Sequence, residues 1–367
     1  MDRVFNAYKM RYQMLNDALL PLRASKKIKR VNIYINLDNF FHRLHSTTTD
    51  KEFQMYGKDI GRQLVGNILN LIGHYKHWAV KEYMQPVIYL YYSSATLFKN
   101  SVIVDQYRRY AIAENILSND KYFYINRAIH DALSIIPVVV KYLKNIYQID
   151  SGFIEPSVIP YYMSQKNPAD LHLIVSRDEY EYQYAYFDNW LLLRPNGDKS
   201  VILSAGNMWD YIQLRNKIET PFHFHPYTFL WGKTILGDKY RSIPKLTRTS
   251  WKTIVKYLLT VDNENTTDSI PIVQQKKLED YINLRKIKDT DFNHNLYCTS
   301  VKHQYDALQV ADTVIIDKQL ENLFDINGLQ LFCREMFKQT PINLSFLLTE
   351  APSQYDEPHD KYFWEMR

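Results

Sequence analysis

The amino-acid sequence predicts an α/β fold in which helices flank a mainly parallel, twisted sheet. Two observations carry this prediction. Short apolar runs of strand length alternate with segments of helical periodicity between residues 31 and 262, as in sheets whose strands are joined by helical crossovers. The chain has 367 residues, of which 46% are hydrophobic, so it can bury one large core or two smaller ones.

The first strand is expected over residues 31–37, because "VNIYINL" is rich in β-branched and aromatic residues. Asp38 and Asn39 follow it, and either is a favourable N-cap for the amphipathic segment that comes next. Apolar residues spaced three and four apart predict a helix over residues 60–75. The run "PVIYLYYSS" predicts a second buried strand over residues 86–94.

The helical pattern resumes beyond residue 127 and is expected to continue to about residue 147, before a further helix that contains Glu155. "DLHLIVS" predicts a third strand over residues 170–176. "WLLLRPNGDKSVILS" predicts a hairpin, because "PNG" is a turn-forming triplet between two apolar runs. Ligands of such sheets bind at the carboxyl ends of the strands.

Two regions flank the α/β part, which we place at residues 31–262. Residues 1–30 have eight basic and two acidic residues, and their apolar residues recur at helical spacing. We interpret them as a basic amphipathic extension: either an arm that docks on nucleic acid or a partner, or a surface helix packed on its own domain. Residues 263–367 show helical periodicity, for example at Leu278, Tyr281 and Leu284, which predicts a helical C-terminal region.

The sequence also bears on the protein's surroundings. It has no apolar run long enough to span a membrane, and its charged N-terminal residues do not fit a signal peptide, so we expect no membrane contact. Two cysteines exclude a disulfide framework and indicate an intracellular protein. The 30 tyrosines and only 10 glycines, with many Ile, Asn and Lys, suggest A/T-rich codons and hence a virus or phage.

Four acids are expected near one edge of the sheet. Asp38 ends the first strand, Glu155 begins a helix, Asp178 follows the third strand, and Asp238 follows a later apolar segment. Carboxylates arranged in this way hold Mg²⁺ or Mn²⁺, and paired cations can catalyse phosphodiester hydrolysis by stabilising both the attacking and the leaving oxygen.

Five motifs resemble, in their order and in their residues, those of the flap endonuclease or 5′→3′ exonuclease superfamily, especially its phage members. This superfamily is related to PIN domains. The motifs are "INLDNFFHRLH", "VIYLYYSSATLFKN", "GFIEPSVIPYYM", "LHLIVSRDEYEYQ" and "LGDKYRSIPKLTRTSWKTIVKYLL", and they cover about residues 31–259. The resemblance implies a metal-dependent nuclease fold, with a helix-hairpin-helix-like element at residues 237–260.

The sequence departs from the family pattern at most of the other acid positions. Ser93 and Ser94 follow the second strand, and Ser157 and Val158 stand in the aspartate positions after Glu155. Tyr180 replaces the second acid of the motif that contains Asp178, and Arg241 replaces the acid that follows Asp238. An arginine is always charged and would compete with a cation for carboxylates, so two-metal catalysis is not expected. A single metal bound by Asp38, Glu155 and Asp178 is the alternative.

Each acid also has a structural interpretation. Asp38 is a suitable helix cap, and Glu155 precedes Pro156 at a helix start, where the helix dipole favours an acid. Asp178 suits a turn after the third strand. Ion pairs of Asp178 with Arg177, or of Asp238 with Arg241, are further structural alternatives.

Basic residues among tyrosines predict a nucleic-acid interface in two stretches. The candidate binding residues are Lys99, Arg108, Arg109, Lys121, Arg127, Lys245, Arg248, Lys252 and Lys256. The alternative for the first stretch is a surface helix with buried tyrosines.

Two functional hypotheses follow. The first is a flap-endonuclease-like pseudo-nuclease that binds DNA or RNA, or serves as a structural subunit with protein partners in a viral or phage nucleic-acid machine. It would be located in the host cytoplasm and associated with a virion or a larger complex. The second is an active nuclease that uses Mg²⁺ or Mn²⁺ at a reduced, single-metal site.

Overall fold

The computed structural model describes most of the chain, in thirteen segments. These are residues 2–25, 28–41, 60–93, 119–140, 143–151, 155–196, 199–215, 226–238, 243–258, 272–305, 315–316, 326–337 and 342–349.

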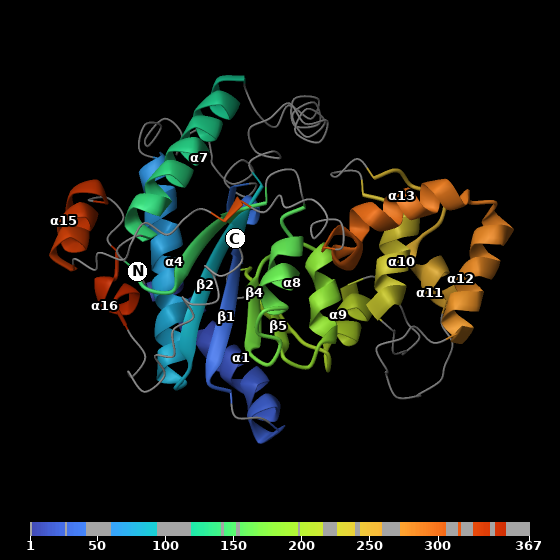
Figure 1. Cartoon of the computed structure of the whole chain (residues 1–367), viewed down its shortest axis with the longest axis horizontal. Coiled ribbons are helices and arrows are strands. Elements are labelled where there is room, and N and C mark those ends of the chain that lie inside the picture. The colour runs from blue at the N-terminus through green and yellow to red at the C-terminus, as the bar shows by residue number, and fades with distance from the viewer. Residues whose placement is uncertain are drawn as a thin grey trace.

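The described strands form one sheet in the order β6-β5-β4-β1-β2-β3-β7 (Figure 1). They are β1 (Arg30–Asn36), β2 (Gln85–Tyr92), β3 (Ile146–Asp150), β4 (Leu171–Val175), β5 (Trp190–Arg194), β6 (Val201–Leu203) and β7 (Ile315–Ile316). β1 to β5 pair in parallel, whereas β6 and β7 are antiparallel edge strands. This confirms the predicted mainly parallel sheet. The chain order reverses between β1 and β4, and the carboxyl ends of strands at such a point are where ligands bind in open α/β sheets.

The strands bury side chains on both faces, with a period of two residues. In β1, Val31, Ile33 and Ile35 contribute to one core cluster, whereas Tyr34 contributes to the other. Asn32 and Asn36 alternate with the apolar side chains and are also buried. Because water is excluded from both faces, these strands are almost wholly apolar, apart from the few polar groups discussed below.

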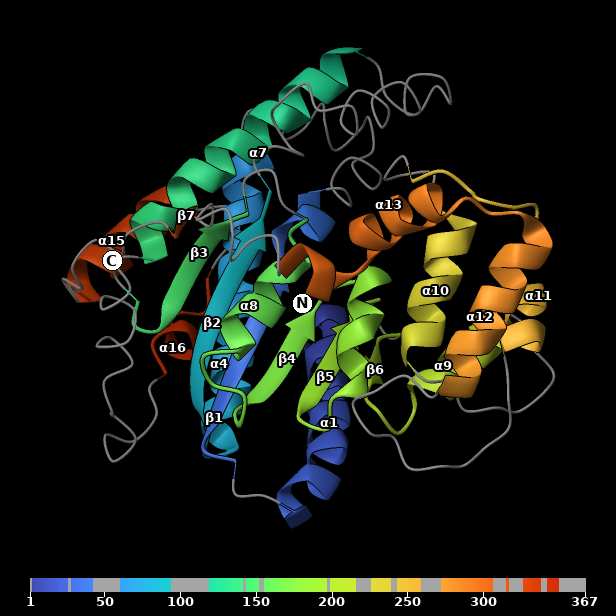
Figure 2. The same ribbon diagram turned by 45° about the vertical axis from the view of Figure 1, so that its right-hand side comes forward.

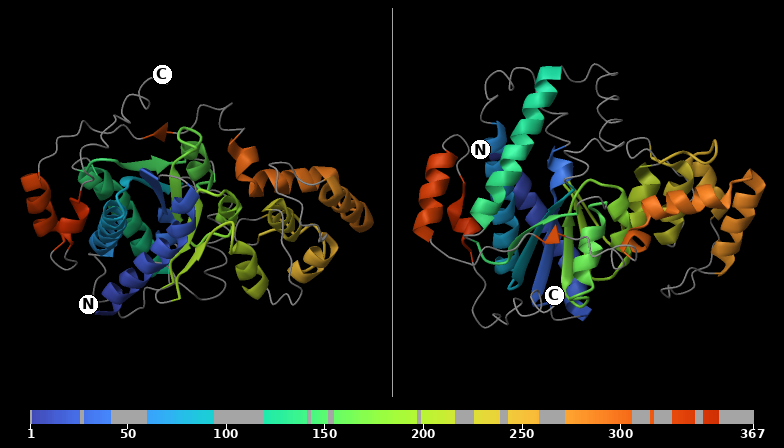
Figure 3. Two further views of the ribbon diagram at one scale, coloured as in Figure 1. Left: turned by 90° about the horizontal axis from the view of Figure 1, so that it is seen from below. Right: turned by 45° about the horizontal axis from the view of Figure 1, so that its top comes forward.

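Helices cover the two faces of the sheet. On the first face lie α1 (Asp2–Ser25), α4 (Ile60–Lys81) and α7 (Asn119–Val140), joined by α15 (Ile326–Met336) and α16 (Leu344–Leu347). On the second face lie α8 (Val158–Ser164), the 3₁₀ helix η1 (Tyr180–Tyr186) and α9 (Met208–Arg215). Figure 3 shows this layered arrangement from two further directions.

The predicted N-terminal helix packs on the protein's own α/β domain. Leu15 and Leu19 of α1 are fully buried in the first core cluster. Trp78 of α4 donates a 2.9 Å hydrogen bond to the Asn16 side chain, and Arg11 donates one of 3.2 Å to the Ser200 hydroxyl. The apolar face of this helix is therefore occupied by the domain itself.

A helical lobe adjoins the sheet beside α9. It contains α10 (Pro226–Leu236), α11 (Trp251–Leu258), α12 (Ile272–Arg285) and α13 (Asp289–Thr299), which lie together on the right of Figures 1 and 2. A third apolar cluster, which includes Trp231, Ile254 and Tyr281, holds these helices together. No helix in the described part of the chain is long and apolar enough to cross a membrane.

Two sequence expectations about elements near β3 were wrong. The helix expected to reach about residue 147 ends at Val140, and β3 begins at Ile146. The helix expected to contain Glu155 begins only at Val158. The expected helical C-terminal region is confirmed, and it also contributes the edge strand β7, where Ile315 and Ile316 pair with β3.

Candidate functional site

The carboxyl ends of β1, β2 and β4 are linked by side-chain hydrogen bonds. Asn36 accepts a 3.2 Å hydrogen bond from the Asn39 backbone N–H and so caps the helical segment of residues 37–41. Asp38, which is 7% exposed, lies within that segment and accepts a 3.4 Å hydrogen bond from the Ser93 N–H. The Asn39 side chain accepts a 2.8 Å hydrogen bond from the Arg177 N–H. The cap is therefore Asn36, and neither Asp38 nor Asn39 has the predicted N-cap role.

Asp178 shapes the turn that follows β4. Its backbone N–H donates a 3.0 Å hydrogen bond to the Ser176 hydroxyl, and its Oδ1 accepts one of 3.0 Å from the Tyr180 N–H. An aspartate that binds the backbone two residues ahead stabilises such a turn. Its position at the carboxyl edge, next to the end of β1, agrees with the sequence expectation.

The other two predicted acids lie on different elements. Glu155 precedes α8, and its carbonyl accepts a 3.0 Å hydrogen bond from the Val158 N–H. The charge of Glu155 also acts on Cys298, near the end of α13. Asp238 follows α10 and exchanges two backbone hydrogen bonds of 2.9 Å with Ile243. Within the described segments, no three His, Cys, Asp or Glu side chains form a group that could hold a metal ion.

Four of the positions where the family resemblance implies further acids hold neutral, buried side chains, whereas Ser94 and Arg241 lie outside the described residues. Ser93 and Val158 are 0% exposed, Ser157 is 1% exposed and Tyr180 is 2% exposed. The Ser157 carbonyl accepts a hydrogen bond from the Tyr184 hydroxyl, which ties this turn to η1. Divalent cations of the Mg²⁺ type need carboxylate oxygens and retained waters. The described residues at these positions therefore do not fit a pair of such cations.

Sequence reasoning missed Glu181, a fully buried carboxyl beneath this edge. It accepts hydrogen bonds from the Tyr91 hydroxyl of β2 and, at 3.1 Å, from the Asn36 side chain of β1. Burial and the charge of Asp178 raise the pKa of Glu181 to about 8, against the opposing effect of hydrogen bonds from Ser176, Tyr91 and Asn36. At neutral pH it is mainly an uncharged acid that links β1, β2 and η1.

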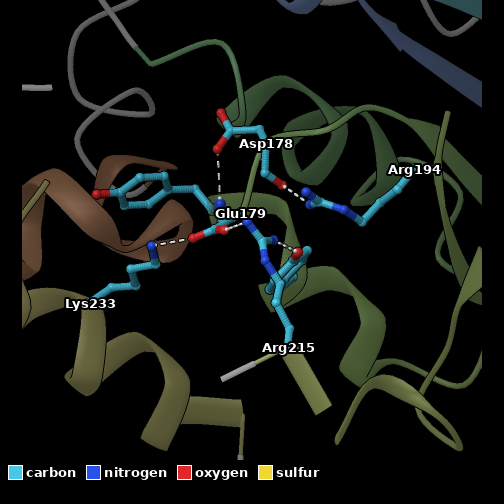
Figure 4. Close-up of polar contacts among 7 residues, drawn as sticks. Asp178, Glu179, Arg194, Arg215 and Lys233 are labelled. Carbon is cyan, nitrogen blue, oxygen red and sulfur yellow. Dashed lines mark hydrogen bonds and ion pairs between the residues drawn. The ribbon is translucent and has the colours of Figure 1, made fainter. Parts of the chain in front are cut away.

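A cationic cluster, also missed, surrounds Glu179 (Figure 4). The Glu179 carboxylate pairs with Lys233 of α10 and, at 2.6 Å, with Arg215 of α9. Arg194 of β5 donates a 3.4 Å hydrogen bond to the Asp178 carbonyl, and its guanidinium lies 4.7 Å from the centre of the Tyr182 ring. Burial alone would raise the pKa of Glu179, but the three cations outweigh it and hold that pKa below its ordinary value.

The sequence does carry a signal for one of these missed residues. In "RDEYEYQ", Glu181 follows Asp178 by only three residues and lies in the first turn of η1, so the two carboxyl groups stay close along the chain. The predicted ion pair of Asp238 with Arg241 stays a prediction, because Arg241 lies outside the described residues. The predicted pair of Asp178 with Arg177 stays one too, since the described contact of Arg177 is the hydrogen bond from its backbone N–H to Asn39.

The predicted nucleic-acid-binding residues are only partly described. Lys245 and Arg248 are exposed in the connection between α10 and α11, and Lys252 is exposed in the first turn of α11. Arg127 is exposed on α7. Lys99, Arg108 and Arg109 lie outside the described residues. Lys121 and Lys256 belong to α7 and α11, but their side chains are not described.

The connection between α10 and α11 has a defined geometry. Gly237 has a φ of +66°, and a Cβ there would lie 2.5 Å from the Ile243 carbonyl, so a glycine is required. The Asn295 side chain donates hydrogen bonds of 2.9 Å and 2.7 Å to the carbonyls of Thr234 and Pro244. Ser250 precedes α11 and accepts a 3.3 Å hydrogen bond from the Thr253 N–H. The three exposed cations are thus held on a well-anchored hairpin.

No protein-family model matches the chain, and no curated protein sequence matches it either. Several solved structures match the chain. A flap endonuclease of bacteriophage T5, in a pseudo-enzyme–product complex with DNA and metal ions, has 11% identity and a TM-score of 0.47, with 87% of this chain and 100% of that chain covered. A mutant 5′-exonuclease of T5 has 12% identity and a TM-score of 0.39, with 85% and 100% covered.

The catalytic core of Rad2 in complex with a DNA substrate has 10% identity and a TM-score of 0.36, with 84% of this chain and 89% of that chain covered. The solved structures found thus include the flap endonucleases and 5′-exonucleases that the sequence motifs resemble. At these identities, the function of the chain has to be argued from its own residues.

Proposed function

We propose that this chain is a catalytically impaired, flap-endonuclease-like protein that binds nucleic acid, or acts as a structural subunit, in a viral or phage nucleic-acid machine. The observation that carries the proposal is the filling of the implied acid positions by Ser93, Ser157, Val158 and Tyr180, all nearly or fully buried. Carboxylates that would bind a second cation are replaced by core side chains, and Glu181 is held uncharged by burial.

Two of the four remaining acids make backbone contacts at this edge. Asp38 accepts a hydrogen bond from the Ser93 N–H, and Asp178 accepts one from the Tyr180 N–H. Each of these carboxylates thus has a backbone N–H as a hydrogen-bond donor. These contacts support a site that keeps its shape without cations.

A nuclease assay tests the loss of catalysis. We expect no cleavage of 5′-flap or single-stranded DNA in Mg²⁺ or Mn²⁺ beyond a no-protein background. The Asp38→Ala/Asp178→Ala double variant should give the same background. If the wild-type protein cleaves and the double variant does not, the chain is instead an active nuclease with a reduced, single-metal site, and the proposal is wrong.

Binding should depend on the exposed cations of the α10–α11 hairpin. We expect the Lys245→Gln/Arg248→Gln/Lys252→Gln variant to bind a 30-nucleotide strand more weakly and with a shallower salt dependence, by up to about 2 to 3 in the slope of log K against log salt. The reason is that a strand releases fewer counterions when fewer of its phosphates are neutralised by the protein. Fluorescence anisotropy across a salt titration measures both quantities.

The matched control removes three positive charges elsewhere. Lys29, Lys81 and Lys199 are exposed, and Lys29 and Lys81 precede β1 and β2, at the opposite edge of the sheet. The Lys29→Gln/Lys81→Gln/Lys199→Gln variant should keep the wild-type slope. An equal weakening of binding in both triple variants would mean that only net charge matters and would remove the hairpin from the proposal.

Composition supports the rest of the proposal. The high tyrosine and low glycine counts favour a viral or phage source, and the two free cysteines favour an intracellular setting. For protein partners, Leu20 of α1 and Leu331 of α15 offer apolar side chains that are 66% and 63% exposed.

A further inference from the structure

A cavity of about 400 Å³ lies between the second face of the sheet and the helical lobe. Its walls come from α8, the start of β4 and β5, η1, α10 and the residues that follow α13. The Gln183 side chain holds the two sides together, since it donates to the Tyr180 and Thr299 carbonyls at 2.9 Å and 2.8 Å. Small-molecule sites of this volume are common where two structural units meet.

The cavity has an aromatic wall. Trp190 stacks on His172 and on Tyr184, with ring centres 4.5 Å apart in both pairs. Both Trp190 and His172 line the cavity, together with Tyr161 and Phe187. Phe187 is 36% exposed, which puts an aromatic ring at the mouth. Trp190 is 4% exposed and His172 0% exposed, so the aromatic surface open to a ligand is that of Tyr161 and Phe187, and it suits a planar ring.

His172 is a buried part of the cavity wall. Its Nδ1 shares a 3.0 Å hydrogen bond with the Tyr34 hydroxyl, and the ring also interacts with the Asn167 backbone. Burial lowers the pKa of His172 to about 3, an effect that the nearby Asn167 backbone partly offsets, so the ring is neutral.

The charge of the lining is positive. Among the described residues that line the cavity, Lys302 is the charged side chain, and no carboxylate is present. Lys302 is exposed, and within the described chain it has neither an ion pair nor a hydrogen bond. Gln165 and Asn189 add amide groups to the lining, and the Asn189 Nδ2 donates to the carbonyls of Pro168 and Asp170.

We infer that this cavity binds a nucleoside monophosphate, with the base against Tyr161 and Phe187, its polar edge at Gln165 and Asn189 and the phosphate at Lys302. The accessible aromatic side chains match a flat heterocycle, the amides match its polar edge, and the unpaired ammonium matches the anionic group. The same chemistry is offered by a free nucleotide and by the terminal nucleotide of a strand. The inference does not depend on the loss of nuclease activity.

Calorimetric titration of the full chain with nucleoside 5′-monophosphates, nucleosides and inorganic phosphate tests the site. We expect saturable binding of at least one monophosphate. Lys302→Gln should weaken it about tenfold by removing a charge-assisted hydrogen bond. The same change should leave binding of the matching nucleoside unaltered. Lys276→Gln, which removes an exposed charge from α12 outside the cavity, is the matched control and should bind as wild type does.

Two further arms complete the test. Gln165→Trp, at an exposed lining position, should block the cavity and abolish binding while the protein stays folded. A 5′-phosphorylated dinucleotide, compared with its unphosphorylated form, detects a strand end as the source, and is too short to engage the α10–α11 hairpin as well. Absence of saturable binding by every monophosphate and by the phosphorylated dinucleotide, or binding indifferent to Lys302→Gln and Gln165→Trp, would overturn the inference. That outcome would not contradict the proposed binding of long strands by the α10–α11 hairpin.

Discussion

Replacement of Glu181 by glutamine is expected to remove a loss of stability that the wild-type protein undergoes as the pH rises from about 4.5 to about 8. Glu181 is fully buried, and its pKa is raised from 4.5 to about 8 by burial and by the charge of Asp178. Glutamine keeps the shape of the protonated acid and can still accept hydrogen bonds from Tyr91 and Asn36, but it cannot ionise.

The direction follows from proton binding. Below about pH 4.5 the carboxyl is protonated in both the folded and the unfolded chain, so its contribution to the free energy of unfolding does not change with pH. Between the two pKa values only the folded chain holds the proton, and stability falls by about 1.4 kcal/mol for each pH unit. Above about pH 8 both states are ionised and the loss is complete. The stabilising form is thus the one present at low pH.

Urea denaturation of the wild type and of Glu181→Gln at pH 5, 6.5 and 8 measures this effect. Other groups titrate in the same range. His74, whose pKa is lowered to about 4 by burial and by His77 and Arg11, makes stability rise with pH between about 4 and 6.5. That contribution is common to both proteins, so the difference between them isolates Glu181. Glu279→Gln, at an exposed position on α12, controls for the removal of one acid. Parallel pH curves for wild type and Glu181→Gln would contradict the assignment.

The sheet was largely predictable because its strands are buried on both faces. β1, β2 and β4 appear in the sequence as predominantly apolar runs, and β5 and β6 flank a turn-forming triplet. β3 was missed because only a few residues separate it from α7, so its apolar residues continue the helical pattern. Asn145, in the turn just before β3, has a φ of 58°, a left-handed conformation that asparagine tolerates. β7 is two residues long and gives no pattern at all.

The site was predictable to the extent that it depends on strand ends. Asp38 and Asp178 follow β1 and β4, which are neighbours, so their shared edge follows from the chain order. The partners of Glu179 could not be found in this way. Arg215 and Lys233 come from α9 and α10, and their approach depends on how the helices pack on the second face of the sheet. Periodicity specifies which face of a helix is buried, but not which distant side chain it meets.

Removal of the Glu179 carboxylate is expected to destabilise the fold more than removal of an ordinary surface ion pair. Lys233 has a side chain only 13% exposed, and its ammonium lies 5.8 Å and 5.9 Å from the ring centres of Tyr180 and Phe229. Without Glu179, this cation stays partly buried with no counter-charge. We expect Glu179→Ala to lower the free energy of unfolding by about 2 kcal/mol, between the values for exposed and for fully buried pairs.

Lys233→Met should cost less than Glu179→Ala, although both break the same ion pair. Methionine fills a similar volume against Tyr180 and Phe229 and leaves no buried charge, while Glu179 keeps Arg215 at 2.6 Å. A double-mutant cycle with Glu179→Ala and Lys233→Met, measured by urea denaturation, gives the coupling between the two residues. The reference cycle uses Arg23→Ala and Glu82→Ala, a pair of 2.6 Å whose side chains are 35% and 20% exposed, for which coupling of at most about 1 kcal/mol is expected. If the Glu179 cycle shows no more coupling than this reference, or if Lys233→Met is the more damaging change, the buried cation does not dominate, and the cluster in Figure 4 is held by packing instead of charge.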